Sequence, residues 1–405
     1  MDLTIRHSRL GMMLRFASFA CCCMMTVALW AEPAEQLKLP VDWERLEAFQ
    51  GRVERADFER ELREIYAPGG RWEDWMRFDE GGVWIRRSAD ESEAYYLAFA
   101  RSGETEPTRR SSGLGGLKIA IDPGHLGGRW AEMERRHFAI GDGEAVREGD
   151  LTLATAKRLR ALLSERGAEV WLTREDDQPA TRYRAEDYFA EADRRLAESG
   201  LSESEETYEE QRNLLAERLF YRDGEIRARA RRLNWMIRPD LALALHVNAV
   251  GWPDPENPSL VDQNDLHVLV NGCYLPSEVA DDAQRFEMVW RIVNGYHEQE
   301  IALARTMART MVEATGLPPY QYSGDNAISM DEEGYIWARN LLANRVFDCP
   351  VVFLEPWTAN SKAVYQWAAL GDYEGKRLVG GEEVKSLPAL YAAFVFEALL
   401  RHFGE

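Results

Sequence analysis

Two histidines and two glutamates occupy positions where a folded α/β chain gathers its ligands. His125 and His246 follow or end apolar runs of strand length, Glu355 ends another such run, and Glu148 precedes the first long helical pattern. In an open α/β sheet, ligands collect at the carboxyl ends of the strands, so these four side chains are predicted to converge at one edge. Two imidazoles and one carboxylate suffice to hold a catalytic zinc ion, and a further carboxylate can act as a base on water. The set has the composition of a metallohydrolase site.

The elements that must position these residues alternate along the chain. Apolar runs of strand length are separated by segments with helical periodicity, and these runs cover residues 117–122, 168–173, 241–246, 266–270 and 350–355. The longest helical patterns cover residues 151–167, 298–315 and 390–403. Near-continuous apolar strands that alternate with helices indicate an α/β sheet with helices on both faces.

Residues 102–116 are rich in Ser, Pro and Gly, which is the composition of a linker. Before them, residues 32–101 combine helical and strand-like patterns and predict a small α+β region, which either has a marginal core of its own or docks on the larger domain. After them, residues 117–405 are expected to form the catalytic domain. A charged helical stretch over about 178–225 is predicted to be an insertion in that domain.

The first 31 residues predict a secretory signal peptide. Three arginines precede an uncharged run over residues 16–31, which is shorter than the roughly 20 residues that a membrane-spanning helix needs. Cleavage after Ala31 leaves a mature chain with no membrane span. An uncleaved anchor and a lipoprotein modified at Cys21 are the alternatives. We therefore expect an exported protein, periplasmic or extracellular, at the cell wall.

Composition narrows the classes of partner. Apolar residues make up 45% of the chain, which indicates a globular protein. The 49 Lys and Arg residues face 69 Asp and Glu residues, and the resulting net charge of −20 repels a phosphate backbone. A nucleic-acid partner is not expected. The mature chain keeps two cysteines, Cys273 and Cys349, which could form one bridge or stay buried as free thiols.

Five sequence motifs in order resemble the zinc-dependent N-acetylmuramoyl-L-alanine amidases of the cell-wall hydrolase type. They are KIAIDPGH at 118–125, EGDLTLA at 148–154, VWLTREDD at 170–177, RARRLN leading to ALALHVNA at 229–249, and VVFLEPWTAN at 351–360. The resemblance implies a mixed, mostly parallel sheet with helices on both faces. It also implies that His125, Glu148 and His246 bind zinc (Zn²⁺) and that Glu355 is the catalytic glutamate. The implied reaction cleaves the amide between N-acetylmuramic acid and L-alanine in peptidoglycan or muropeptides.

The chain departs from this family pattern at two places near the site. The loop between His125 and Glu148 is longer than usual, and PWTAN stands where the family places a Gly-Phe-Leu-Ser-Asn-like turn. The insertion at 178–225 either covers the cleft as a lid or is a solvated surface addition. Two other functions compete with the amidase: a zinc peptidase acting on cell-wall peptides, and a non-catalytic wall-binding regulator. The intact set of four site residues argues against the regulator.

Other candidate residues each have two interpretations. Asp122 orients the His125 imidazole or only forms the turn, and Arg339 with Asn340 binds a stem-peptide carboxylate or forms structural ion pairs. Asn248 is expected to shape the site through backbone hydrogen bonds. Among the remaining histidines, His267 is interpreted as a hydrogen-bonded strand residue, His137 as a loop residue with or without a substrate contact, and His297 and His402 as surface residues. Three tryptophans either stack on sugar rings or pack in the core: Trp130, Trp252 and Trp357.

Overall fold

The computed structural model describes residues 32–404, apart from residues 91, 102–112, 203, 253, 255 and 256. The predicted signal peptide and most of the predicted linker lie outside the described residues. Among the described helices, none combines the length and the apolar character needed to cross a bilayer.

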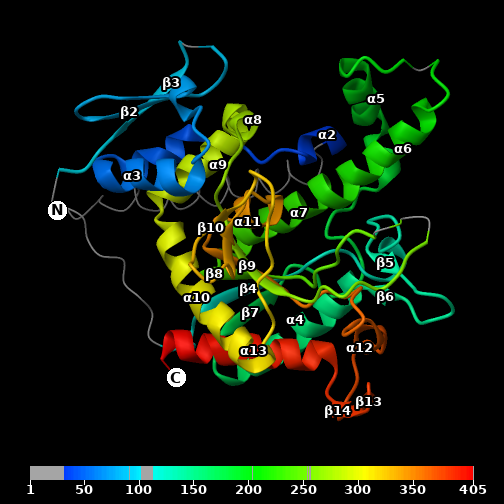
Figure 1. Cartoon of the computed structure of the whole chain (residues 1–405). Helices are drawn as coiled ribbons and strands as arrows, with labels where there is room; N and C mark the ends of the chain where they lie inside the picture. Colours follow the sequence, from blue (N-terminus) through cyan, green and yellow to red (C-terminus); the bar gives the residue numbers. More distant parts are fainter. Residues whose placement is uncertain are drawn as a thin grey trace, which may run out of the picture.

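A seven-stranded mixed sheet forms the centre of the molecule (Figure 1). Its strands, in spatial order, are β10 (Ile328–Ser329), β11 (Ile336–Ala338), β9 (Leu266–Val270), β12 (Val351–Pro356), β8 (Leu241–Leu245), β4 (Lys118–Pro123) and β7 (Glu169–Leu172). The last four run parallel to one another, whereas β9 and β11 run in the opposite direction. The predicted fold class, a mixed and mostly parallel α/β sheet, is confirmed.

Helices cover both faces of this sheet, as Figure 1 shows. One face packs on α4 (Glu148–Glu165), α10 (Tyr296–Thr315) and α13 (Leu387–Phe403), and the core between them is aliphatic. The other face packs on α7 (Glu225–Arg231), on α11 (Leu342–Arg345) and on the chain that leads into β12. All residues of β8 and β9 are buried, which explains why both strands appear in the sequence as continuous apolar runs.

The strand directions decide which side chains meet at one edge. Because β4, β8 and β12 are parallel, their carboxyl ends lie at the same edge and carry His125, His246 and Glu355. Because β9 is antiparallel to β12, the beginning of β9 lies at this edge too, and His267 pairs with Glu355 in register. This edge of the sheet therefore carries residues from the carboxyl ends of β4, β8 and β12 and from the amino end of β9.

Residues 32–101 form a small region whose elements are α2 (Pro33–Gln36), η1 (Trp43–Phe49), α3 (Arg55–Glu61), η2 (Leu62–Tyr66), η3 (Trp72–Asp74), β1 (Met76–Phe78), β2 (Gly82–Arg86) and β3 (Ala94–Ala98). The three strands make an antiparallel sheet. Its core continues into α8 (Pro276–Ala280) and α9 (Asp282–Val293), where Val279, Phe286 and Val289 pack against residues such as Trp43 and Leu62. The N-terminal residues thus dock on the rest of the chain through a shared apolar core.

The stretch predicted as an insertion contains η5 (Ala185–Tyr188), α5 (Phe189–Glu198) and α6 (Tyr208–Arg218). The helical chain continues from α6 through η6 (Leu219–Gly224) and α7 to η7 (Arg232–Ile237). Small elements complete the fold: η4 (Gly128–Trp130), β5 (His137–Phe138), β6 (Val146–Arg147), α12 (Tyr365–Ala369), β13 (Arg377–Val379) and β14 (Glu382–Val384). The insertion packs beside the start of the His125–Glu148 loop, where Leu126 and Trp130 join its apolar core.

Candidate metal centre and active site

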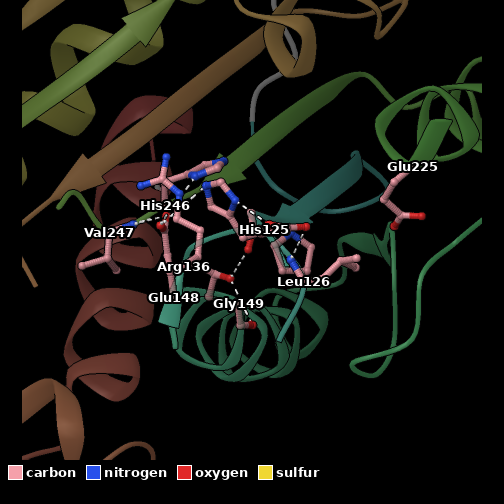
Figure 2. A network of polar contacts seen from close by, with 12 residues as sticks. His125, Leu126, Arg136, Glu148, Gly149, Glu225, His246 and Val247 are labelled. Carbon is pink, nitrogen blue, oxygen red and sulfur yellow. Dashed lines mark hydrogen bonds and ion pairs between the residues drawn. The ribbon is translucent and has the colours of Figure 1, made fainter. Parts of the chain in front are cut away.

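His125, Glu148 and His246 come together from three separate elements. His125 lies in the loop after β4, Glu148 is the first residue of α4, and His246 follows β8, and Figure 2 shows their side chains pointing toward one another. The His246 Nδ1 atom lies 3.0 Å from Glu148 Oε1, and the His125 Nε2 atom lies 3.5 Å from Glu148 Oε2. One ligand atom from each residue falls within 4.8 Å of the others.

These separations suit a tetrahedral metal site. Zinc binds His nitrogen and carboxylate oxygen at about 2.0–2.2 Å, so neighbouring ligands of a tetrahedron lie roughly 3.3 Å apart. The separations of 3.0 and 3.5 Å, which involve different oxygens of Glu148, are close to that value. Two imidazoles and one carboxylate also form a donor set that suits zinc and leaves a fourth position open. The residues present therefore fit a catalytic zinc ion.

The backbone of the DPGH turn has two unusual features, a close approach to His246 at Gly124 and a positive φ at His125. A Cβ atom at Gly124 would lie 2.3 Å from the His246 ring, so only glycine allows the two segments to approach this closely. His125 itself has a φ of 56°, a region that residues other than glycine seldom occupy. The Arg174 guanidinium donates to the His125 carbonyl and to that of Gly149, which holds this turn against the start of α4.

Glu148 is ionised in this environment. Burial by itself raises the pKa of its carboxyl, but His125, His246 and Arg136 outweigh burial and bring the pKa to about 2. The carboxylate also accepts a hydrogen bond from the Val247 N–H. Glu148 is therefore a carboxylate at neutral pH, which is the form that binds a metal.

Glu355 is paired with His267 rather than with an arginine. The His267 Nε2 atom lies 3.1 Å from Glu355 Oε2, and the His267 ring is enclosed by Tyr320 and Tyr322, with ring centroids 4.6 and 5.5 Å away. Burial raises the pKa of the Glu355 carboxyl, and attraction by His267 outweighs burial, so the pKa lies below its ordinary value. A carboxylate held in this way can accept a proton at neutral pH.

One pocket of about 150 Å³ contains two of the three metal-ligand candidates, His125 and Glu148, together with Glu355. Its lining is polar and consists of His125, Arg136, Glu148, Val247, Asn248, Ala249, His267, Tyr320, Tyr322, Arg339 and Glu355. Asn248 shapes this wall as expected, because its backbone N–H donates to Trp357 and its carbonyl accepts from Ala359. The pocket brings predicted metal ligands and one predicted base within reach of a single small substrate group.

The residue that orients His125 is Glu134, which the sequence did not reveal. Its Oε2 atom lies 2.7 Å from His125 Nδ1, and its other oxygen accepts from the Leu126 N–H. A carboxylate on the far nitrogen of a metal-binding imidazole fixes the tautomer and the ring orientation. Glu134 lies in the long loop after the first motif, where no periodic pattern marked it.

The interpretation of Asp122 as the partner of His125 is wrong. Asp122 accepts instead from Thr173 and from Arg229, whose guanidinium also contacts Glu225. Glu225 in turn accepts from the N–H groups of residues 180 and 181 at 2.9 Å. Asp122 is thus part of a buried ionic network that holds the DPGH segment in place, because Arg229 also donates to the Pro123 carbonyl.

His137, His297 and His402 lie outside the pocket lining, and so do the three candidate tryptophans. The expectation for His297 is wrong, because it is buried against Tyr66 and burial lowers its pKa to about 4. His137 contacts Glu132 and does not line the pocket. Trp130 and Trp357 pack in apolar cores, which excludes the sugar-stacking interpretation for both.

The two cysteines at 273 and 349 are separate buried thiols.

The insertion does not line this pocket. None of the described residues between 178 and 225 is part of its wall, and the packing of the insertion on Leu126 and Trp130 places it beside the turn. The lid interpretation finds no support in the pocket lining, and the interpretation as a surface addition agrees with the packing.

A family model for N-acetylmuramoyl-L-alanine amidases (Amidase_3) matches residues 119–374, which is more than half of the chain. The chain belongs to this family. It is accordingly an amidase that hydrolyses peptidoglycan, with the activity that the sequence motifs implied. No curated protein matches the chain in a sequence comparison.

Solved structures of amidases resemble the chain at low identity. Ami1 from Mycobacterium smegmatis is 17% identical with a TM-score of 0.37, and the match covers 72% of this chain and 99% of that one. The CwlD amidase from Clostridioides difficile, solved in complex with the GerS lipoprotein, is 12% identical with a TM-score of 0.39 (71% and 99% covered). AmiC2 of Nostoc punctiforme is 16% identical with a TM-score of 0.35 (72% and 100% covered). The family assignment rests on the family model.

Proposed function

We propose that this amidase depends on zinc, held by His125, Glu148 and His246, and that Glu355 is its general base. The observation that carries the proposal is the cluster of three ligand atoms within 4.8 Å of one another beside the pocket that also contains Glu355. The substrate is the amide between the lactyl group of N-acetylmuramic acid and L-alanine, in peptidoglycan or in muropeptides.

Hydrolysis of this amide needs a proton transfer that Glu355 can perform. Zinc, when bound, supplies a Lewis acid that polarises the carbonyl and promotes attack by water near neutral pH. Glu355 accepts a proton from the attacking water as the new C–O bond forms. It then passes that proton to the nitrogen as the C–N bond breaks, which releases the lactyl carboxylic acid and the free amine of L-alanine. His267 keeps the carboxylate aimed at the pocket.

The completeness of the set supports an enzyme over the non-catalytic regulator. A non-catalytic regulator has no use for an ionised Glu355 in the pocket of the ligand cluster. A zinc peptidase would use the same chemistry on another amide, so it is distinguished by the bond that is cut. We also propose that the protein is exported to the cell wall and that residues 117–405 form its catalytic domain, on which residues 32–101 dock.

Digestion of purified sacculi and of a soluble muropeptide tests this function. We expect the zinc-loaded protein to release stem peptides with a free L-alanine amine and to leave glycan chains with intact lactyl groups. Mass spectrometry of the products identifies the cleaved bond. New ends within the stem peptide would instead show a peptidase, and the absence of new ends would favour the regulator.

Glu134 gives a separate test of the metal centre. Replacing Glu134 by alanine is expected to weaken zinc binding by about 10- to 100-fold, because the orienting carboxylate of His125 is lost. Competition with a chromogenic chelator measures the Kd for zinc. Glu132→Ala is the matched control, since Glu132 lies in the same loop with a side chain that is 74% exposed. Equal zinc affinities for the two variants would contradict the role given to Glu134.

A further inference from the structure

Among the described residues, Arg339 is the cation of the pocket that lacks a carboxylate partner. Glu148 pairs with the two site histidines, Glu355 pairs with His267, and Arg136 lies 3.8 Å from Glu148. Within the described part of the chain, the side-chain hydrogen bond of Arg339 goes to the Tyr322 hydroxyl, at 3.3 Å. Burial raises the pKa of Tyr322, so this phenol stays neutral and does not balance the charge of the guanidinium.

The fold holds Arg339 in place for an incoming group. Its backbone N–H donates to Val270, which fixes the chain at the end of β11. Its guanidinium carbon lies 5.2 Å from the centre of the Tyr322 ring, and the same ring touches His267. Trp337, Leu269 and His267 lie on one face of the sheet by the register of β11 and β9, and Arg339 continues this face by strand alternation.

The polar residues Asn340 and Arg345, near Arg339 in the sequence, are bound by other protein side chains. Arg345 is 8% exposed and donates to Glu287 at 2.6 Å and to Asn340 at 2.7 Å. Asn340 donates to Gln284. Both are satisfied by protein partners, so the structural interpretation holds for Asn340. Arg339 differs, because it lines the pocket that contains Glu355.

We propose that Arg339 binds a carboxylate of the stem peptide and makes this enzyme selective for substrates with a free carboxylate next to L-alanine. The inference rests on the proposed function. Arginine presents a planar fork of donors that matches a carboxylate in two parallel hydrogen bonds. The pocket of about 150 Å³ holds both Arg339 and Glu355, so the carboxylate that it selects is the first one along the stem from the scissile amide.

Two matched substrates test this selectivity. One is N-acetylmuramoyl-L-alanyl-γ-D-glutamyl-L-lysine, and the other is the same molecule with the glutamyl α-carboxylate converted to a carboxamide. Wild-type protein is expected to cleave the carboxylate form with a kcat/KM about 10- to 100-fold higher, mostly through KM. Arg339→Gln is expected to cleave both forms equally with its zinc retained, and Arg339→Lys to keep part of the preference. Arg401→Gln removes the same charge from an exposed site on α13 and is expected to keep the full preference.

The outcomes distinguish a failure of the role proposed for Arg339 from a failure of the proposed amidase function. Equal kcat/KM for the two substrates in wild-type protein would overturn the role of Arg339, and so would an unchanged preference in both Arg339 variants. Failure of zinc-loaded wild-type protein to cleave either substrate would overturn the proposed function and the inference with it. Calorimetric titration of each variant with the released tripeptide adds a measurement without turnover, in which Arg339→Gln is expected to bind more weakly.

Discussion

Replacing Glu355 by glutamine is expected to lower kcat by about 10²- to 10⁴-fold while zinc stays bound, which is the range for loss of a general acid–base group. Glutamine keeps the shape of the side chain and can still contact His267, but it cannot accept the proton of the attacking water. Zinc is retained because the carboxylate partners a histidine of β9 and not the ligand cluster. Muropeptide turnover and elemental analysis of the same preparation measure the two effects.

Glu382→Gln is the control for this experiment, since Glu382 is an exposed glutamate on β14. It is expected to leave both kcat and zinc content unchanged. Near wild-type turnover of Glu355→Gln with zinc bound would remove Glu355 from the mechanism. Loss of zinc together with activity would place Glu355 among the metal ligands instead.

The central strands could be predicted from the sequence because they are buried on both faces. The apolar runs at 117–122, 241–246 and 350–355 lie within one residue of β4, β8 and β12 at each end. Burial on both faces leaves a continuous hydrophobic signal, and parallel strands then bring His125, His246 and Glu355 to one edge. The rule that ligands gather at carboxyl ends was sufficient for these three residues.

Strand direction could not be predicted, and this explains some of the missed residues. An apolar run predicts a strand but does not say which way it points, and β9 runs antiparallel to β12. This direction turns His267 from an ordinary strand histidine into the partner of Glu355. Tyr320 and Tyr322 reach the same pocket from a segment without periodicity. Side chains contributed by irregular segments leave no pattern in a single sequence.

Whether the N-terminal region docks on the rest of the chain could not be predicted from the sequence, for a different reason. The sequence left open whether residues 32–101 fold alone or dock, because their size allows only a marginal core. Leu62 and Phe58 are fully buried in a cluster that also contains Phe286 and Val289 of α9. These partners are more than 200 positions apart in the chain. Contacts at such separation depend on the complete fold and are invisible to local patterns.

Replacing His246 by alanine is expected to remove most of the bound zinc. The site then keeps His125 and Glu148 as ligands, and the loss of chelation adds to the loss of one bond, so the Kd for zinc rises by more than the ~10- to 100-fold expected for an orienting residue. The His246 ring also stacks on Phe353, with centroids 4.1 Å apart, so its removal leaves a gap beside β12. Circular dichroism and thermal unfolding therefore accompany the zinc measurement.

His267→Ala is the matched control for this prediction, because it removes a second imidazole from the same site. Its ring is 1% exposed and contacts Glu355, whereas the ligand cluster is formed by other residues. His267→Ala is therefore expected to keep zinc while losing turnover, and His246→Ala to lose both. Full zinc occupancy in a folded His246→Ala protein would rule out His246 as a ligand. Zinc loss in both variants would mean that the ion depends on both imidazoles, which would place the metal nearer to Glu355 than the Glu148 distances indicate.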